Sequence, residues 1–203
     1  RKNLRNYIWE NTDKTRCRTL LDHGIYNSDN LLDSYIGSMM EAPGIFYLDN
    51  NLDIKKSRLT LREELDMKWL SKTLRSNDIQ AALHQIFTNV RLKNLIEIRD
   101  IDCLPFDHII APVAFLTGLI ENRSFRGKLV SEFSSWTKQE RKAWNKLALK
   151  LDIDEDAPKN KKYIDWIKWV SDLAIDGMEQ RKLGEEKYFI DFNQNIIDNR
   201  PLS

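Results

Sequence analysis

The sequence has few cysteines and no long apolar run, which excludes several classes of protein. Only Cys17 and Cys103 occur among its 203 residues, too few for the disulfide framework of a secreted scaffold or for a thiolate metal site. No apolar stretch approaches the roughly 20 residues that cross a bilayer, and the first residues lack the apolar core of a signal peptide. We therefore expect a cytoplasmic protein with reduced thiols and no membrane partner.

An excess of charge of one sign is also missing. The 32 Lys and Arg residues are balanced by 31 Asp and Glu residues, so we expect no nucleic-acid partner. The three histidines lie far apart in the sequence and predict no zinc site. No P-loop or Rossmann glycine pattern is present, so a bound nucleotide would have to be held by other means. The chain opens at Arg1 without an initiator Met, which favours a piece of a longer protein.

Apolar residues at three- and four-residue spacing predict that most of the chain is helical. Helices are expected at residues 29–40, 59–74, 76–87, 161–182 and 186–198. Another is expected to begin at Pro105 and to include HIIAPVAFLTGLI, and one more to follow a capping box formed by Thr137 and Glu140. The first is expected to be capped by a residue in 27–29 and the third by Ser76 or Asn77. HIIAPVAFLTGLI is apolar almost all round and is expected to be buried.

Few segments have the pattern of strands. IFYL, a polar turn and LDI predict a short hairpin near residues 45–54. With the strand described next, this gives an α+β fold, mostly helical with a small antiparallel sheet. So few strands cannot close a barrel, which suggests that chain not present here completes the sheet.

Residues 90–99 alternate with the period of a strand. Apolar Val90, Leu92, Ile96 and Ile98 share one face, with Asn94 as the exception, and Arg91, Lys93, Glu97 and Arg99 share the other with Leu95. In one continuous strand, a rise of ~3.3 Å per residue would place Glu97 about 7 Å from Arg99 and about 20 Å from Arg91.

A carboxylate beside guanidinium groups suits a site in which a magnesium ion and a phosphoryl group lie together. Mg²⁺ takes oxygen ligands, usually one or two carboxylates and substrate phosphates, while Arg offers a fixed fork of donors to a phosphoryl group. A charged outer face is also normal for a half-solvated antiparallel strand, and the pattern alone leaves both interpretations open.

Motifs along most of the chain resemble one family. LIEIRDID followed by PFDHIIAPVAFLTGLI resembles the last active-site strand and following helix of the glutamine synthetase-like superfamily, where a Glu-x-Arg pair precedes a Pro-containing apolar helix. VRLKNLIEIRDID is more closely similar to glutamate-cysteine ligases of the plant and proteobacterial type. Further segments follow in the family's order: IWENTDKTR after Arg5, SYIGSMMEAPGIFYL, LTLREEL and FSSWTKQER.

This resemblance implies a fold and an activity. Residues 1–203 would be the C-terminal portion of a single glutamine synthetase-like catalytic domain, whose missing N-terminal half carries further metal-binding carboxylates. The complete enzyme would use ATP and Mg²⁺ to join the γ-carboxylate of glutamate to cysteine through γ-glutamyl phosphate, the first step of glutathione synthesis. Its partners would be glutamate, cysteine, ATP and the missing half.

The resemblance also implies roles for particular residues. Glu97 would bind Mg²⁺, and Arg99 would be catalytic, in contact with the transferred phosphoryl group or the substrate carboxylate. Arg91, also placed in the catalytic set, and Arg16 would bind nucleotide phosphate or the α-carboxylate of glutamate, and which does which stays open. Arg5 joins the substrate-binding set. For Arg5 and Arg16 the alternative is a surface or interface ion pair.

The amine substrate is the least determined part of the resemblance. The family has an aromatic residue near the amine substrate in a Pro-Met-Tyr-Phe run, where this chain has Pro43, Gly44, Ile45 and Phe46. The tyrosine hydroxyl is either replaced by an aliphatic group or moved to Tyr47. Two alternatives therefore stay open: a related carboxylate-amine ligase that uses another amine, and a catalytically silent interaction or regulatory module.

Two other features favour structural roles. Cys103 has no neighbouring His or Gly-rich elbow and is expected to be a buried thiol and not a nucleophile. Trp166 and Trp169, three residues apart, are expected to pack within a helical core.

Overall fold

The computed structural model of the chain describes residues 4–17, 30–150 and 152–198. The chain divides into two compact units, unit 1 (residues 1–4 and 101–203) and unit 2 (residues 5–100). Over the described ranges most of the chain is helical, and each of three sheets has two antiparallel strands. This confirms the predicted α+β class.

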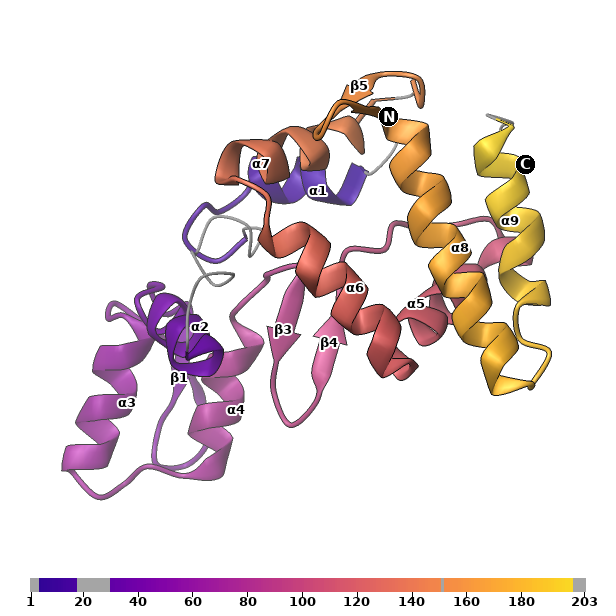
Figure 1. The fold of residues 1–203 in the computed structure, drawn as a ribbon. Helices are drawn as coiled ribbons and strands as arrows, with labels where there is room; N and C mark the ends of the chain where they lie inside the picture. Colours follow the sequence, from indigo (N-terminus) through magenta and orange to yellow (C-terminus); the bar gives the residue numbers. More distant parts are fainter. Residues whose placement is uncertain (1–3, 18–29, 151, 199–203) are drawn as a thin grey trace. The chain divides into compact units, whose positions relative to one another are not determined.

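Unit 2 consists of short helices and two β-hairpins (Figure 1). Its elements are α1 (Leu4–Glu10, whose first residue belongs to unit 1), α2 (Leu31–Met40), β1 (Phe46–Leu48), β2 (Ile54–Lys56), α3 (Leu61–Leu70), α4 (Ser76–His84), β3 (Val90–Leu92) and β4 (Ile96–Ile98). Its core is formed by Tyr35, Met39, Ala42, Leu61, Ala82 and Ile86. The antiparallel pairing of β1 with β2 confirms the hairpin predicted near residues 45–54.

Side-chain caps decide where two of these helices begin. The side chain of Asn30 caps α2, while the predicted caps at 27–29 lie outside the described residues. The carboxylate of Asp78, in the first turn of α4, accepts the backbone N–H of Arg75 at 2.9 Å. Arg75 is therefore the cap residue of α4, and the prediction that Ser76 or Asn77 caps it is wrong.

The prediction of one continuous strand over residues 90–99 is also wrong. The chain turns back at residues 93–95, so that β3 and β4 form a hairpin in which Val90 pairs with Ile98 and Leu92 with Ile96. The physical reason lies at Asn94, a residue type that favours turns, at the point where the alternation already failed.

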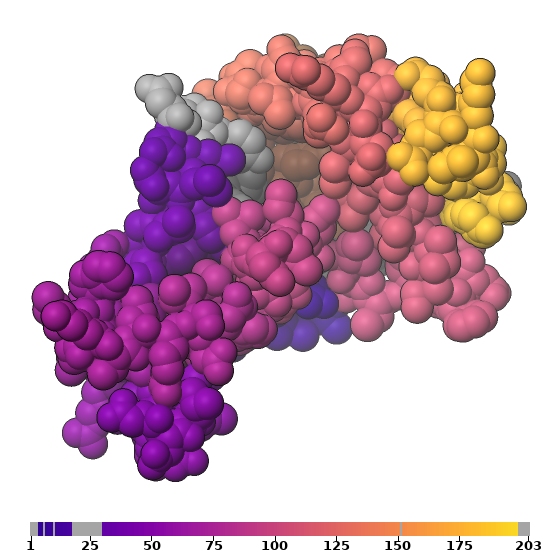
Figure 2. Space-filling model, turned by 90° about the horizontal axis from the view of Figure 1, so that it is seen from below, coloured from indigo at the N-terminus to yellow at the C-terminus, as the bar shows by residue number. Residues whose placement is uncertain are grey.

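Unit 1 is a group of helices with one very short hairpin. Its elements are the 3₁₀ helix η3 (Phe106–His108), α5 (Ala111–Glu121), α6 (Arg123–Ser134), α7 (Lys138–Leu147), β5 (Asp156–Ala157), β6 (Lys161–Lys162), α8 (Tyr163–Arg181) and α9 (Lys187–Ile197). Helix α8 packs against α5 and runs beside α9 (Figure 1). In Figure 2 the yellow surface belongs to α9, whose outer side exposes Tyr188 and Ile190.

The core of unit 1 buries only part of the apolar segment HIIAPVAFLTGLI. It contains Ala111, Ala114, Leu119, Phe125, Leu173, Ala174, Met178 and Phe189. The expectation that HIIAPVAFLTGLI is buried all round is wrong, because Ile109, Ile110 and Val113 are more than half exposed. Within α5, only the stripe that meets α8 is fully buried.

The tryptophan prediction is confirmed. Trp166 is buried, and its ring lies 4.9 Å from that of Trp136 and 5.6 Å from that of Trp169, in edge-to-face arrangements. Such contacts between aromatic rings stabilise a core. Among the helices in the described ranges, none has the length and apolarity needed to cross a bilayer.

Two glycines let α5 and α8 approach closely. A Cβ built on Gly177 would lie 2.0 Å from the carbonyl oxygen of Gly118, and one on Gly118 would lie 2.1 Å from the carbonyl oxygen of Ala174. Backbone atoms cannot move aside as the end of a flexible side chain can. Glycine is therefore required at this crossing because the two backbones meet there.

We expect Gly177→Ala to lower the free energy of unfolding by about 3 kcal/mol, the upper part of the usual range for overpacking. Gly127→Ala is the matched control, since Gly127 lies in α6 with open space around its Cα. Alanine there should raise stability by about 0.5–1 kcal/mol because glycine is a poor helix former. Urea unfolding followed by tryptophan fluorescence measures both, and equal effects of the two variants would contradict the close crossing.

Candidate active site

The β3–β4 hairpin places Arg91 opposite Glu97. The two residues are cross-strand partners, and Nε and Nη2 of Arg91 each lie 2.7 Å from Oε2 of Glu97. The separation of about 20 Å expected for one strand is therefore wrong, because the turn folds the second half of the segment back on the first. The expectation that both side chains share one face holds, since cross-strand partners project from the same face.

Three cations surround the Glu97 carboxylate. Besides Arg91, Nη1 of Arg99 donates to Oε1 of Glu97 at 2.9 Å, and Nζ of Lys93 lies 3.4 Å from Oε2. Hydrogen bonding from Arg91, with further contributions from Lys93 and Arg99, lowers the pKa of Glu97 from 4.5 to about 2. The carboxylate is thus ionised at any physiological pH, and its side chain keeps 30% of its surface exposed.

A pH dependence follows from the lowered pKa of Glu97. The ionised carboxylate binds its partners only in the folded chain, so its contribution to stability is complete above the unfolded pKa of about 4.5 and is lost as pH falls through about 2. Glu97→Gln should therefore differ most in stability from the original chain near neutral pH, and the difference should shrink below pH 4.5. Denaturant unfolding of both proteins between pH 7 and 3 measures this, and a difference that grows on acidification would contradict it.

Arg91 and Arg16 are buried and bind backbone carbonyls at the end of α4. Nη1 of Arg91 donates to the carbonyls of His84, at 3.3 Å, and Ile86, at 3.0 Å, and Nη1 of Arg16 donates to that of Gln85 at 3.3 Å. The last carbonyls of a helix lack partners within it and carry partial negative charge, so cations suit them. These arginine donors take the place of further helical hydrogen bonds, and α4 ends at His84, three residues before the predicted end.

The remaining donors of Arg16 are also used. Its Nη2 donates to the carbonyl of Pro43, and its Nε donates to Asp13 at 2.7 Å. Asp13 also accepts from Thr15, which is the main reason that its pKa is lowered to about 2. Asp13 therefore orients Arg16, and Arg16 ties the segments around α4 together.

Arg99 and Arg5 keep donors that have no acceptor. The guanidinium groups of Arg5 and Arg99 lie 4.8 Å and 5.3 Å from the ring centre of Trp9, within the range of cation–π contacts. In each arginine the Nε is buried, and across the described residues it meets no hydrogen-bond acceptor. A buried N–H without an acceptor is costly, so an anion that reached either atom would be stabilised there.

Asp100 follows Arg99 in the sequence, and the charge of Arg5 acts on its carboxylate. Burial raises the pKa of its carboxyl group, while a hydrogen bond from Asn89 and the charge of Arg5 oppose that rise. Its Oδ1 is buried and, like the two Nε atoms, finds no hydrogen-bond partner in the described part of the chain. Sequence reasoning missed both Asp100 and Trp9 as members of the site, although both stand inside motifs that it used.

Tyr47 lies in a different hollow. This hollow, of about 350 Å³, is formed by β1, β2 and α3 and is lined by Tyr47, Lys56, Arg58, Leu59, Glu64, Met67 and Lys68. None of these residues belongs to the Glu97 cluster. The Tyr47 ring is 37% exposed.

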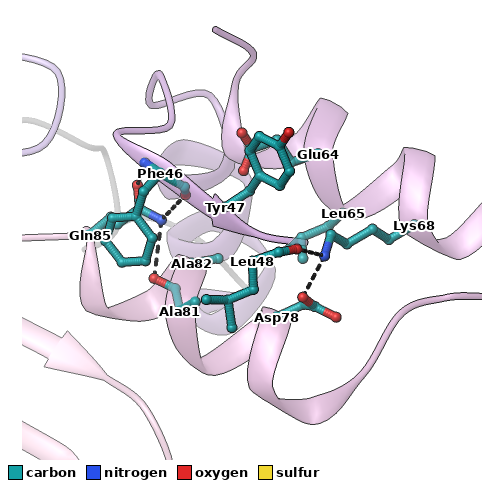
Figure 3. A pocket seen from close by; sticks show the side chains of 10 residues that line it. All are labelled: Phe46, Tyr47, Leu48, Glu64, Leu65, Lys68, Asp78, Ala81, Ala82 and Gln85. Atoms are coloured by element: carbon teal, nitrogen blue, oxygen red, sulfur yellow. Dashed lines mark hydrogen bonds and ion pairs between the residues drawn. The ribbon is translucent and has the colours of Figure 1, made fainter. Parts of the chain in front are cut away.

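Polar side chains hold the strand that carries Tyr47. Figure 3 shows Lys68 reaching between the carbonyl of Leu48 and the Asp78 carboxylate, with Nζ 2.6 Å from Oδ1 of Asp78. Nε2 of Gln85 donates to the carbonyl of Phe46 at 2.9 Å. These bonds hold β1 against α4 and so position the strand that carries Tyr47.

The cluster around Glu97 suits an anion better than a bare metal ion. Three cations and one carboxylate leave a net positive charge, which repels Mg²⁺ unless a polyphosphate is bound beside it. No group of three or more His, Cys, Asp or Glu residues within the described ranges is arranged to hold a metal. The residues present therefore do not form a magnesium site by themselves, and they match the charge of a polyphosphate.

The prediction that Cys103 is buried is wrong. Both cysteines are free, as expected, and Cys17 is buried, but Cys103 is exposed. Cys103 lies in the connection after β4, where Oδ1 of Asp102 accepts its backbone N–H at 3.1 Å. A residue in such a connection has no packed face of a helix or strand to cover it.

Comparison with known proteins finds similarity to one family of enzymes. Residues 2–199 match the family described as glutamate-cysteine ligase family 2 (GCS2). The chloroplastic glutamate–cysteine ligase of Arabidopsis thaliana is 30% identical over 141 residues, which cover 68% of this chain and 27% of that protein. That of Medicago truncatula is 26% identical over 192 residues, covering 91% of this chain and 36% of that protein. The chain thus spans about a third of the length of these relatives, whose names place them in the chloroplast and give the cytoplasmic prediction no support.

Proposed function

We propose, because this chain belongs to glutamate-cysteine ligase family 2, that it is the C-terminal portion of a single ATP-dependent ligase domain formed with an N-terminal half that is not present here. The complete enzyme would join the γ-carboxylate of glutamate to the amine of cysteine. The observation that supports this most is the pair of buried Nε atoms in Arg5 and Arg99, neither of which finds an acceptor among the described residues. Arg99 also pairs with Glu97, a carboxylate that holds three cations.

The proposed reaction has two steps. An oxygen of the glutamate γ-carboxylate attacks the γ-phosphorus of ATP, the bond to the bridging oxygen breaks, and ADP leaves with its electron pair. The amine nitrogen then attacks the carbonyl carbon of γ-glutamyl phosphate, the bond from carbon to the phosphate oxygen breaks, and the nitrogen loses a proton. The first step needs positive charge beside the phosphoryl group.

The residues of unit 2 would divide this work. Arg99 would donate from Nε to an oxygen of the transferred phosphoryl group, while Glu97 holds its Nη1 in place. Arg5 would donate to the same polyphosphate or to the glutamate carboxylate. Arg91 and Arg16, whose donors are occupied by Glu97, Asp13 and backbone carbonyls, would position the others more than touch substrate.

Mg²⁺ enters the proposal only for the complete enzyme. Glu97 would supply one oxygen ligand, and carboxylates of the missing half together with the phosphates of ATP would supply the rest. Bound there, the metal would neutralise charge on the phosphates. For residues 1–203 alone, a titration with Mg²⁺ should show no saturable binding.

Cysteine is the expected amine, and Tyr47 is proposed to help to bind it. A second candidate, a related ligase with another amine, is favoured by Ile45, which is 47% exposed where the family has an aromatic residue. Rates of ADP release by the complete enzyme with glutamate and a series of amines decide between them. Cysteine should be the fastest acceptor, and a clear preference for a different amine would support the second candidate.

A further inference from the structure

A second hollow lies wholly within unit 1. It has a volume of about 610 Å³ and is bounded by α5, α6, α7, α8, α9 and the segment after β4. Sites for small molecules are usually clefts of about 300–1,000 Å³ with mainly apolar walls. Water inside such a hollow would find few hydrogen-bond partners.

The walls are mostly aromatic. Six rings line the hollow: Phe115, Phe133, Trp144, Trp166, Phe189 and Phe192. Among the described residues, the lining contains no Lys or Arg, and its one carboxylate, that of Asp102, already accepts the backbone N–H groups of Leu4 and Cys103. The hollow therefore suits a neutral ring and neither ATP nor glutamate, which separates it from the ligase site.

One polar side chain in this wall is unsatisfied. Asn193 stands in the inward stripe of α9 between Phe189, Phe192 and Ile196, at positions where apolar residues would suffice. It is 7% exposed, and its Oδ1 has no hydrogen-bond partner within the described ranges. A buried amide oxygen is costly without a donor, and the side chain of Asn193 lines the hollow.

We propose that this hollow binds a small, neutral, flat aromatic ligand that carries one N–H or O–H group, with the ring between the aromatic walls and the donor on Oδ1 of Asn193. Helices α8 and α9, side by side in Figure 1, would supply much of the wall. Because unit 1 contains every residue of this site, ligand binding does not depend on ligase activity.

Indole and indene test the proposal, since the two rings have nearly the same shape and only indole carries an N–H. Ligand-observed nuclear magnetic resonance titrations of residues 1–203 measure both affinities. We expect indole to bind about tenfold more tightly, as one hydrogen bond to a buried acceptor allows. Failure of both rings to bind at millimolar concentration would overturn the proposal.

Asn193→Leu should abolish the preference for indole while indene still binds, which would show that the hollow persists. Gln194→Leu is the matched control, because this neighbouring amide is exposed on the same helix, and it should keep the tenfold preference. Equal affinity for the two rings in the original chain would overturn the proposal. It would indicate an apolar surface that receives side chains from another segment of a longer protein.

Discussion

Replacing Glu97 with glutamine in the complete enzyme is expected to lower kcat at least about 100-fold, the size of effect seen when one preorganised charged or hydrogen-bonding group is lost from a transition-state site. The reason is geometric. Glu97 holds Nη1 of Arg99 at 2.9 Å and Nε of Arg91 at 2.7 Å, and glutamine cannot hold three cations. The lost charge also weakens the oxygen ligand proposed for Mg²⁺. ADP release with glutamate and cysteine measures the rate.

The control for this variant is Glu41→Gln, the same change at an exposed carboxylate that pairs with Arg62. It should leave kcat unchanged. Because Glu97 also neutralises the buried Arg91, denaturant unfolding must accompany the kinetics. A Glu97→Gln enzyme that unfolds more easily but keeps its rate would show that the cluster is only structural and would contradict the proposed role.

Residues 1–203 alone are expected to show ADP release at least about 1,000-fold slower than the complete enzyme, because the residues described here do not form a magnesium site by themselves. Phosphoryl transfer from ATP depends on neutralising the phosphate oxygens, and metal ions supply much of that charge. Addition of the N-terminal half should restore turnover. The assay is ADP release with both substrates present.

Two further samples make that result interpretable. Residues 1–203 carrying Glu97→Gln, mixed with the same N-terminal half, should fail to restore turnover. The N-terminal half alone should also be inactive. Rapid ADP release by residues 1–203 without any addition would contradict the proposal that the active site is shared between the two halves.

The fold could be predicted from the sequence where the signal was local. Periodic apolar spacing predicted most helices, the Thr137–Glu140 capping box begins α7 as predicted, and Trp166 packs against Trp169 as their spacing predicted. The β3–β4 hairpin was missed because its partners Arg91 and Glu97 are an even number of residues apart, so that a turn between them preserves which face each occupies. Only Asn94 and Leu95 broke the alternation, and they mark the turn.

The candidate site was harder to predict because burial depends on residues distant in sequence. The charge pattern identified Arg91, Glu97 and Arg99 as one group. The pattern could not show that Arg91 and Arg16 would donate hydrogen bonds to backbone carbonyls at the end of α4. Nor could it show that Arg5 and Arg99 meet over Trp9, since that contact joins a helix and a hairpin about 90 residues apart.

A crystal structure of the complete enzyme with Mg²⁺ and a non-hydrolysable ATP analogue would show whether Arg99 contacts the transferred phosphoryl group. We expect an oxygen of the γ-phosphate at about 2.7–2.9 Å from Nε of Arg99, the distance of a charge-assisted hydrogen bond, with Glu97 still bound to Nη1. A nucleotide bound elsewhere, with the Nε of Arg99 still lacking an acceptor, would contradict the assignment of this cluster to phosphoryl transfer.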